Sequence, residues 1–195
     1  MSWSFYADAA LTTELDDWLT EHWTDHSEIY RTAQVWLGNP TAGTKIEATS
    51  DPGVDPITVT PVVSVAAWAA SIAYALGAVR RPTTPNGYVY TATAAGTSGA
   101  SQPTWPTVIG NTVVDNGVTW TCSAEQDLTT EYKLATTEAG LAAATAGAGV
   151  SLGTSVLAGV GTAVSFWIRC TNAGTNTQTQ SHVRIEANAL QVTAA

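Results

Sequence analysis

Hydrophobic and polar residues alternate over short stretches near both ends of the chain, and turn residues separate these stretches. The alternating stretches are residues 33–37, 45–48, 57–60, 132–135, 150–152, 164–170 and 182–187. In the sixth, Val164, Phe166 and Ile168 fall on one face, as a half-buried strand requires. Gly38-Asn39-Pro40 and Asp51-Pro52-Gly53 are typical of the turns between strands. The pattern predicts an all-β protein.

The middle of the chain has a different pattern, because glycine, proline, asparagine and serine interrupt it every few residues. Such punctuation predicts short strands joined by tight turns. We therefore expect a β-sandwich of immunoglobulin-like type, built from residues 1–63 and 127–195, that is split by a small inserted β module at residues 64–126. A surface loop tolerates such an insertion because closing a longer loop costs little free energy.

Six aromatic residues of the insert divide into two groups. We expect Trp68, Tyr74 and Trp120 to form its small core, since a unit of this size has few other large side chains to bury. Tyr88, Tyr90 and Trp105 lie next to turns and are the residues expected to remain exposed. An exposed aromatic ring can stack on the apolar face of a sugar, but for each of the three residues packing is favoured over ligand stacking.

The N-terminal segment is acidic, with no lysine or arginine before Arg31. Its apolar residues recur at helical spacing, and Thr13 with Asp16 could cap a helix. A short acidic helix and an extended acidic loop are both open. His22 and His26 stand four residues apart, which is metal-ligand spacing on a helix, but a site needs further ligands. We therefore expect His22 and His26 to lie on a solvent-exposed face and to bind no metal.

Composition excludes several classes of protein. The formal net charge is −9, which repels phosphate backbones, so we expect no nucleic-acid partner. The uncharged stretch 62–79 is rich in alanine, which favours linker and strand over a membrane span. The first residues lack the basic start and apolar core of a secretory signal. The uncharged segment 141–163 is either a packed meander or a surface covered by another subunit.

No catalytic arrangement is apparent in the sequence. Cys122 and Cys170 are expected to be free, buried thiols, as in a protein assembled in a reducing cytoplasm. Neither cysteine has a motif that supplies a base, and no serine lies in a nucleophile elbow. We expect no enzyme activity and no cofactor.

One resemblance rests on the middle of the chain. Its residues are Trp68, Tyr74-x-x-Gly77-x-Val79, Gly87-Tyr88-x-Tyr90, Ala95-Gly96-Thr97-Ser98-Gly99, Pro103-Thr104-Trp105-Pro106, Val113, Asp115, Gly117 and Val118-Thr119-Trp120. This pattern resembles a small module of tailed-bacteriophage virion proteins, and its first half is similar to chitin-binding carbohydrate-binding modules. The resemblance implies a glycan-binding role for Tyr88, Tyr90 and Trp105.

The flanks carry a second, more diffuse resemblance. Trp3-Ser4-Phe5-Tyr6, Val35-Trp36-Leu37-Gly38 and Ser50-Asp51-Pro52-Gly53 are similar to the opening of accessory structural proteins of tailed phages, and Trp167-Ile168-Arg169 is similar to their closing strands. The resemblance implies a virion component assembled in the host cytoplasm, most closely a capsid decoration or minor capsid protein. Expected partners are the major capsid or other virion proteins, further copies of the chain as a trimer, and a bacterial surface glycan. A tail, baseplate or fibre accessory protein and a stand-alone carbohydrate-binding protein are the alternatives.

Overall fold

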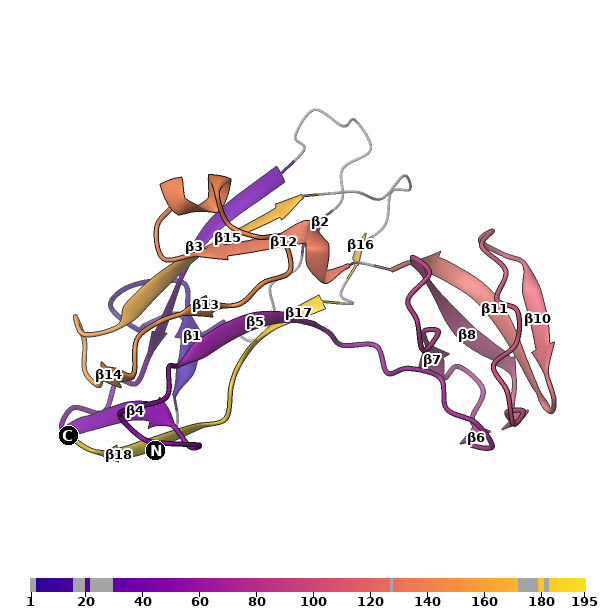
Figure 1. The fold of residues 1–195 in the computed structure, drawn as a ribbon, viewed down its shortest axis with the longest axis horizontal. Helices are drawn as coiled ribbons and strands as arrows, with labels where there is room; N and C mark the ends of the chain where they lie inside the picture. The colour runs from indigo at the N-terminus through magenta and orange to yellow at the C-terminus, as the bar shows by residue number, and fades with distance from the viewer. Residues whose placement is uncertain (1–2, 16–19, 22–29, 127, 172–178, 181–182) are drawn as a thin grey trace. The chain divides into compact units, whose positions relative to one another are not determined.

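The protein is nearly all β and sandwich-like, and the residues that the structure describes contain two short 3-10 helices (Figure 1). The computed structural model describes residues 3–15, 20–21, 30–126, 128–171, 179–180 and 183–195. The chain divides into two compact units. Unit 1 comprises residues 1–62, 129–179 and 184–195, and unit 2 comprises residues 63–128 with 180–183.

Three antiparallel sheets of unit 1 contain most of its strands. The first has the order β1-β3-β15-β12, the second β13-β5-β17 and the third β14-β4-β18, while β2 pairs with β16. The bounds are β1 Ser4–Tyr6, β2 Thr20–Glu21, β3 Tyr30–Gly38, β4 Thr44–Ala48, β5 Thr58–Val63, β12 Tyr132–Ala135, β13 Val150–Ser151, β14 Ser155–Leu157, β15 Val164–Thr171, β16 Thr179–Gln180, β17 Val183–Ala187 and β18 Leu190–Ala194, with helices η1 Thr129–Glu131 and η2 Ala139–Ala142.

Strands β3 and β15 lie at the centre of the first sheet, in a register that pairs Val35 with Phe166 and Leu37 with Val164. Phe166, Ile168 and Cys170 of β15 are buried and alternate with less buried residues, and Val35 and Leu37 do the same on β3, as the alternation in the sequence predicts. Buried residues come from all three sheets: Val35, Leu37, Phe166, Ile168, Tyr132 and Leu134 from the first, Val59 and Val150 from the second, and Ile46 and Val156 from the third. Phe5 of β1 adds an edge-to-face contact to Phe166, with ring centroids 5.7 Å apart.

The segment 141–163 is a meander that is only partly buried. Leu141, Val150, Leu152 and Val156 are buried along it, while Leu157 and Val160 are 56% and 68% exposed. Gly159 N donates to the carbonyl of Asn39, which ties the meander to the turn after β3. The segment therefore packs four apolar side chains into unit 1 and leaves Leu157 and Val160 on the surface.

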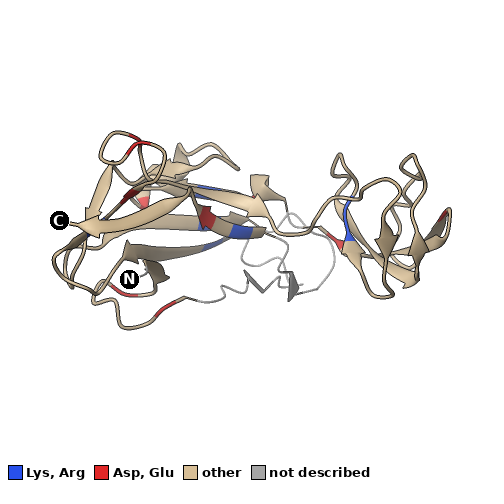
Figure 2. Ribbon diagram, turned by 90° about the horizontal axis from the view of Figure 1, so that it is seen from below, with Lys and Arg blue, Asp and Glu red and all other residues tan. Residues whose placement is uncertain are grey.

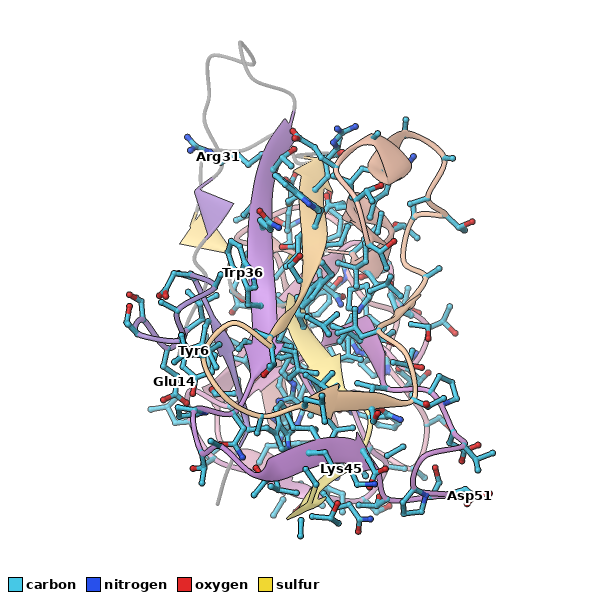
Figure 3. All side chains as sticks on the ribbon, turned by 90° about the vertical axis from the view of Figure 1, so that its left-hand side faces the viewer. Tyr6, Glu14, Arg31, Trp36, Lys45 and Asp51 are labelled. Atoms are coloured by element: carbon cyan, nitrogen blue, oxygen red, sulfur yellow. The ribbon has the colours of Figure 1, made fainter. Side chains whose placement is uncertain are left out.

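The acidic N-terminal segment begins with a turn, not with a helix cap. The Asp8 carboxylate accepts hydrogen bonds from the backbone amides of Thr12 and Thr13 at 3.2 and 2.8 Å. Glu14 then forms an isolated bridge with Tyr6, and these two residues lie near each other in Figure 3, where β3 carries Trp36 and β4 carries Lys45. Thr13 therefore starts no helix. Asp16, His22 and His26 lie outside the described residues.

Unit 2 contains a four-stranded antiparallel sheet, β10-β11-β8-β7, and a two-stranded ribbon, β6-β9 (Figure 1). The bounds are β6 Ala73–Tyr74, β7 Val79–Arg80, β8 Tyr88–Ala94, β9 Gly96–Thr97, β10 Thr112–Asp115 and β11 Val118–Glu125. Asn116-Gly117 forms the two-residue turn between β10 and β11, with Asn116 at φ +54°. The turn packs against β9 so closely that a Cβ on Gly96 would lie 2.1 Å from the Gly117 oxygen, and this approach requires glycine at position 96.

Candidate functional site in unit 2

Aromatic side chains form the core of unit 2. Trp68, Tyr74, Tyr90 and Trp120 are buried there, and Trp105 packs on them from the loop before β10. The ring centroids are 5.0 Å apart for Tyr74 and Trp120, 4.3 Å for Tyr90 and Trp105, and 5.8 Å for Trp105 and Trp120. The separations of 5.0 and 5.8 Å are in the range where aromatic pairs attract each other beyond simple burial, and the Tyr90–Trp105 pair is slightly closer than that range. All members come from residues 68–122, so unit 2 has a core of its own.

A buried carboxylate holds this core in place. Asp115 is 3% exposed, and its Oδ2 accepts hydrogen bonds from the indole nitrogens of Trp68 and Trp120 at 2.7 and 3.1 Å. Its Oδ1 accepts from the backbone amide of Gly99 at 2.8 Å. Hydrogen bonds to an ionised acceptor are stronger than neutral ones, and three of them offset the cost of burying this charge. Asp115 therefore has a structural role that joins three segments of unit 2.

The expectation for the core group is confirmed, because Trp68, Tyr74 and Trp120 are all buried. The expected exposure of Tyr90 is wrong. Its side chain is 0% exposed, its hydroxyl accepts a hydrogen bond from Asn86 Nδ2 and donates one to the Pro106 carbonyl, both at 2.7 Å. Burial raises the pKa of the Tyr90 hydroxyl, which keeps it protonated. Because alternation puts Tyr90 on the same face of β8 as buried Ala92, the ring packs inward and has no face for a ligand.

Tyr88 and Trp105 are half-buried, and both pack against the core. Part of each side chain therefore remains accessible, unlike that of Tyr90. The Trp105 indole nitrogen is buried and has no hydrogen-bond partner among the described residues. An unpaired buried donor costs free energy, so this tryptophan is held by packing alone. Of the three residues predicted to bind a glycan, two keep some surface for contact with a ligand.

The opposite face of the four-stranded sheet consists of small uncharged side chains, which the sequence analysis did not single out. The face is formed by Val79, Thr91, Thr93, Thr112, Val114, Thr119, Thr121 and Ser123. Thr91 Oγ1 donates to Ser123 Oγ at 2.9 Å, and the hydroxyls of Thr93 and Thr121 are 3.1 Å apart. The hydroxyls thus bond largely to one another. Alternating threonines at i and i+2 in two paired strands are the signal that would have predicted this face.

The described residues offer little chemistry for catalysis or for a metal. No group of three His, Cys, Asp or Glu residues gathers among them, and His182, like His22 and His26, lies outside them. Cys122 and Cys170 are buried thiols outside any disulfide, and burial raises the pKa of the Cys122 thiol, which disfavours the reactive thiolate. Within the described part of the chain, no helix has the length and apolar character needed to cross a membrane.

Charge is distributed unevenly along the sequence. Residues 63–128 contain two arginines against Asp115, Glu125 and Asp127, a net charge of −1 out of −9 for the whole chain. Figure 2 shows how few charged positions unit 2 displays among its described residues. One arginine, Arg80, lies over the ring of Tyr74 with its guanidinium carbon 5.0 Å from the centroid. Unit 2 therefore has a nearly neutral, aromatic and hydroxyl-rich character.

Comparison of the chain with protein-family models, with curated proteins and with solved structures finds no match.

Proposed function

We propose that this protein is a structural component of a tailed-phage virion, most closely a capsid decoration or minor capsid protein. The observation that carries the proposal is the modular build of the chain: an acidic sandwich-like unit 1 interrupted by a nearly neutral unit 2 that has its own aromatic core. In a decoration protein, one unit docks on the particle and the other projects from it. The sequence resemblances of both parts to tailed-phage virion proteins support this division.

Unit 1 supplies apolar surface for docking. Val54, Leu157 and Val160 are 65%, 56% and 68% exposed, and the last two lie close together in sequence on the meander 141–163. Exposed apolar side chains gain free energy when a partner covers them. The proposed partners are the major capsid protein and further copies of this chain, with a trimer as the favoured assembly.

Unit 2 supplies the part that faces outward, and a bacterial surface glycan is its proposed ligand. Tyr88 and Trp105 are the contact residues of this proposal, because they keep accessible surface while Tyr90 does not. One stacked ring contributes only about 1 kcal/mol, so a single site binds weakly. Many copies on one particle raise the effective affinity without any new contact. Low intrinsic affinity is therefore compatible with the role.

The location of the protein is the direct test. Purified particles of the phage that encodes the chain should contain it in many copies per particle by quantitative mass spectrometry, and antibody-gold labelling should mark the capsid. A few copies per particle with labelling of the tail would replace the decoration role by a tail or baseplate role. Absence from the particles would refute the proposal of a virion component.

Glycan binding needs a separate test, in which beads that display many copies of the protein are titrated with bacterial surface polysaccharide. Tyr88→Ala and Trp105→Ala should each weaken capture, whereas Thr93→Ala on the opposite face is the matched control and should not. Far-ultraviolet circular dichroism checks that every variant is folded. Equal capture by all folded variants would exclude the aromatic pair as the site.

A further inference from the structure

Unit 2 contains two asparagines that are followed directly by glycine, Asn86-Gly87 and Asn116-Gly117. In this dipeptide the backbone nitrogen of the second residue can attack the side-chain carbonyl carbon of the first, since glycine has no Cβ to hinder the approach. We propose that Asn86 is a site of spontaneous deamidation in the folded protein and that Asn116 is protected from the same reaction. The proposal does not depend on the virion role.

The surroundings of Asn86 favour the attack. The backbone nitrogen of Gly87, which is the nucleophile, has no hydrogen-bond partner among the described residues. Tyr88 N donates to Asn86 Oδ1 at 3.2 Å, which folds the side chain back over the Gly87 peptide. The same bond stabilises the negative charge that develops on Oδ1 during the attack, as backbone amides do in oxyanion sites. Asn86 and Gly87 are half-buried, so water can reach them.

The surroundings of Asn116 oppose the corresponding attack of Gly117 N on the Asn116 side chain. Gly117 N donates to the carbonyl of Thr97 at 3.0 Å, so the nucleophile is already engaged. Asn116 Nδ2 donates to the same carbonyl at 3.1 Å. The two residues form a two-residue turn between paired Asp115 and Val118, and Gly117 lies tightly against β9. Ring closure at Asn116 would have to break these contacts first.

The reaction at Asn86 balances with water as its only co-reactant. A bond forms between Gly87 N and Asn86 Cγ, the Gly87 N–H proton passes through water to Nδ2, and the Cγ–Nδ2 bond breaks with release of ammonia. The cyclic succinimide then takes up one water molecule and opens to a carboxylate, either in the normal backbone or in the isoaspartyl form. The net change replaces an amide by an acid and adds one backbone methylene in the second case.

Conversion would weaken the contacts around Tyr90. Asn86 Nδ2 donates to the Tyr90 hydroxyl at 2.7 Å, and a carboxylate at position 86 has no proton to donate. The hydroxyl also holds the Pro106 carbonyl at 2.7 Å, next to Trp105. A negative charge beside this buried phenol is poorly solvated. Deamidation therefore loosens the loop that packs Trp105 on the core.

The test follows both sites in the full-length protein during incubation in mildly alkaline buffer, by peptide mass spectrometry with fragmentation that separates aspartyl from isoaspartyl products. In the folded protein Asn86 should convert roughly tenfold faster than Asn116, because the second site must first break a backbone hydrogen bond. In concentrated urea the two sites should convert at similar rates. The proposal would be overturned if Asn116 converted as fast as Asn86 or faster in the folded protein. It would also be overturned if, in urea, Asn116 converted and Asn86 stayed intact.

Three variants complete the design. Asn86→Gln should abolish conversion at position 86, since the longer side chain closes the ring far more slowly, and leave the rate at Asn116 unchanged. Asn86→Asp imitates the product and should lower the thermal midpoint of unit 2 more than Asn116→Asp does. A smaller effect of Asn86→Asp than of Asn116→Asp would contradict the loosening of the Trp105 loop.

Discussion

The carboxylate of Asp115 offers the sharpest test of how unit 2 is held together. Asp115→Ala leaves three donors without an acceptor: the buried indole nitrogens of Trp68 and Trp120 and the half-buried amide of Gly99. Each unpaired donor costs about 1–3 kcal/mol, and partial entry of water reduces the sum to about 4 kcal/mol. A unit of this length has a stability of roughly 3–10 kcal/mol, so the substitution removes a large part of it.

Asp115→Asn gives an intermediate case. The amide oxygen can turn toward the two indoles, and its NH₂ group then faces the Gly99 amide, so one donor is lost and the others lose the charge of the acceptor. We expect a cost of about 2 kcal/mol. Stability should therefore fall in the order Asp, Asn, Ala at this position.

Urea titration of the full-length chain, followed by hydrogen exchange with mass spectrometry, reads the two units separately. Protection from exchange in peptides that span β8 and β11 should fall from the unmodified chain to Asp115→Asn and further to Asp115→Ala. Protection in peptides from β3 and β15 should not change. Asp51→Ala is the matched control, because it removes an exposed aspartate from unit 1. If the free energy of unfolding of unit 2 in Asp115→Ala lay within about 1 kcal/mol of its value in the unmodified chain, the carboxylate would not organise the core, and the reasoning would be refuted.

Three further predictions concern packing, pH and modularity. Gly96→Ala should destabilise unit 2 by about 1–3 kcal/mol, since its Cβ would collide with backbone atoms of Gly117; an unchanged urea midpoint would argue against the close approach. A hydrogen bond and ion pair from Lys45 at 2.8 Å lower the pKa of Glu47 below its ordinary 4.5, although desolvation opposes this. The stabilisation is complete above the unfolded-state pKa and is lost as pH falls through the lower folded-state pKa, so unit 1 should weaken below about 4.5, and Glu47→Gln should flatten the acid limb of stability against pH. Replacing residues 64–126 by a short Gly/Ser linker should leave unit 1 with a cooperative unfolding transition, and a chain without one would show that the sandwich needs the insert.

Much of the strand pattern is local, and the sequence was sufficient to predict it. The stretch 132–135 coincides with β12, and 164–170 lies within β15, because a two-residue period with β-branched and aromatic residues specifies a half-buried strand. The Asn116-Gly117 pair marks a hairpin turn in the same way, through the positive φ that it tolerates. The strands β14 and β18 were not predicted, since their alternation is weak and their pairing with β4 joins distant residues.

The candidate site depended more on tertiary structure. Trp68, Tyr74 and Trp120 were predicted as core residues on size alone, and this was sufficient because a small unit must bury its largest side chains. Tyr90 was expected to be exposed because it lies near a turn, and position along the chain does not specify which face of a strand a loop will cover. The loop carrying Trp105 and Pro106 packs over Tyr90 and buries it.

By itself, the sequence determined the all-β class, the positions of seven of the eighteen described strands, several turns and the uneven distribution of charge, since each depends on residues that are neighbours along the chain. Tertiary structure alone decided that Asp115, which looks like an ordinary turn residue, binds Trp68, 47 residues away, and that the threonines of β8 and β11 form one uncharged face. The physical reason is that burial and hydrogen bonding depend on which distant segments meet, and local alternation permits either face of a strand to be the buried one.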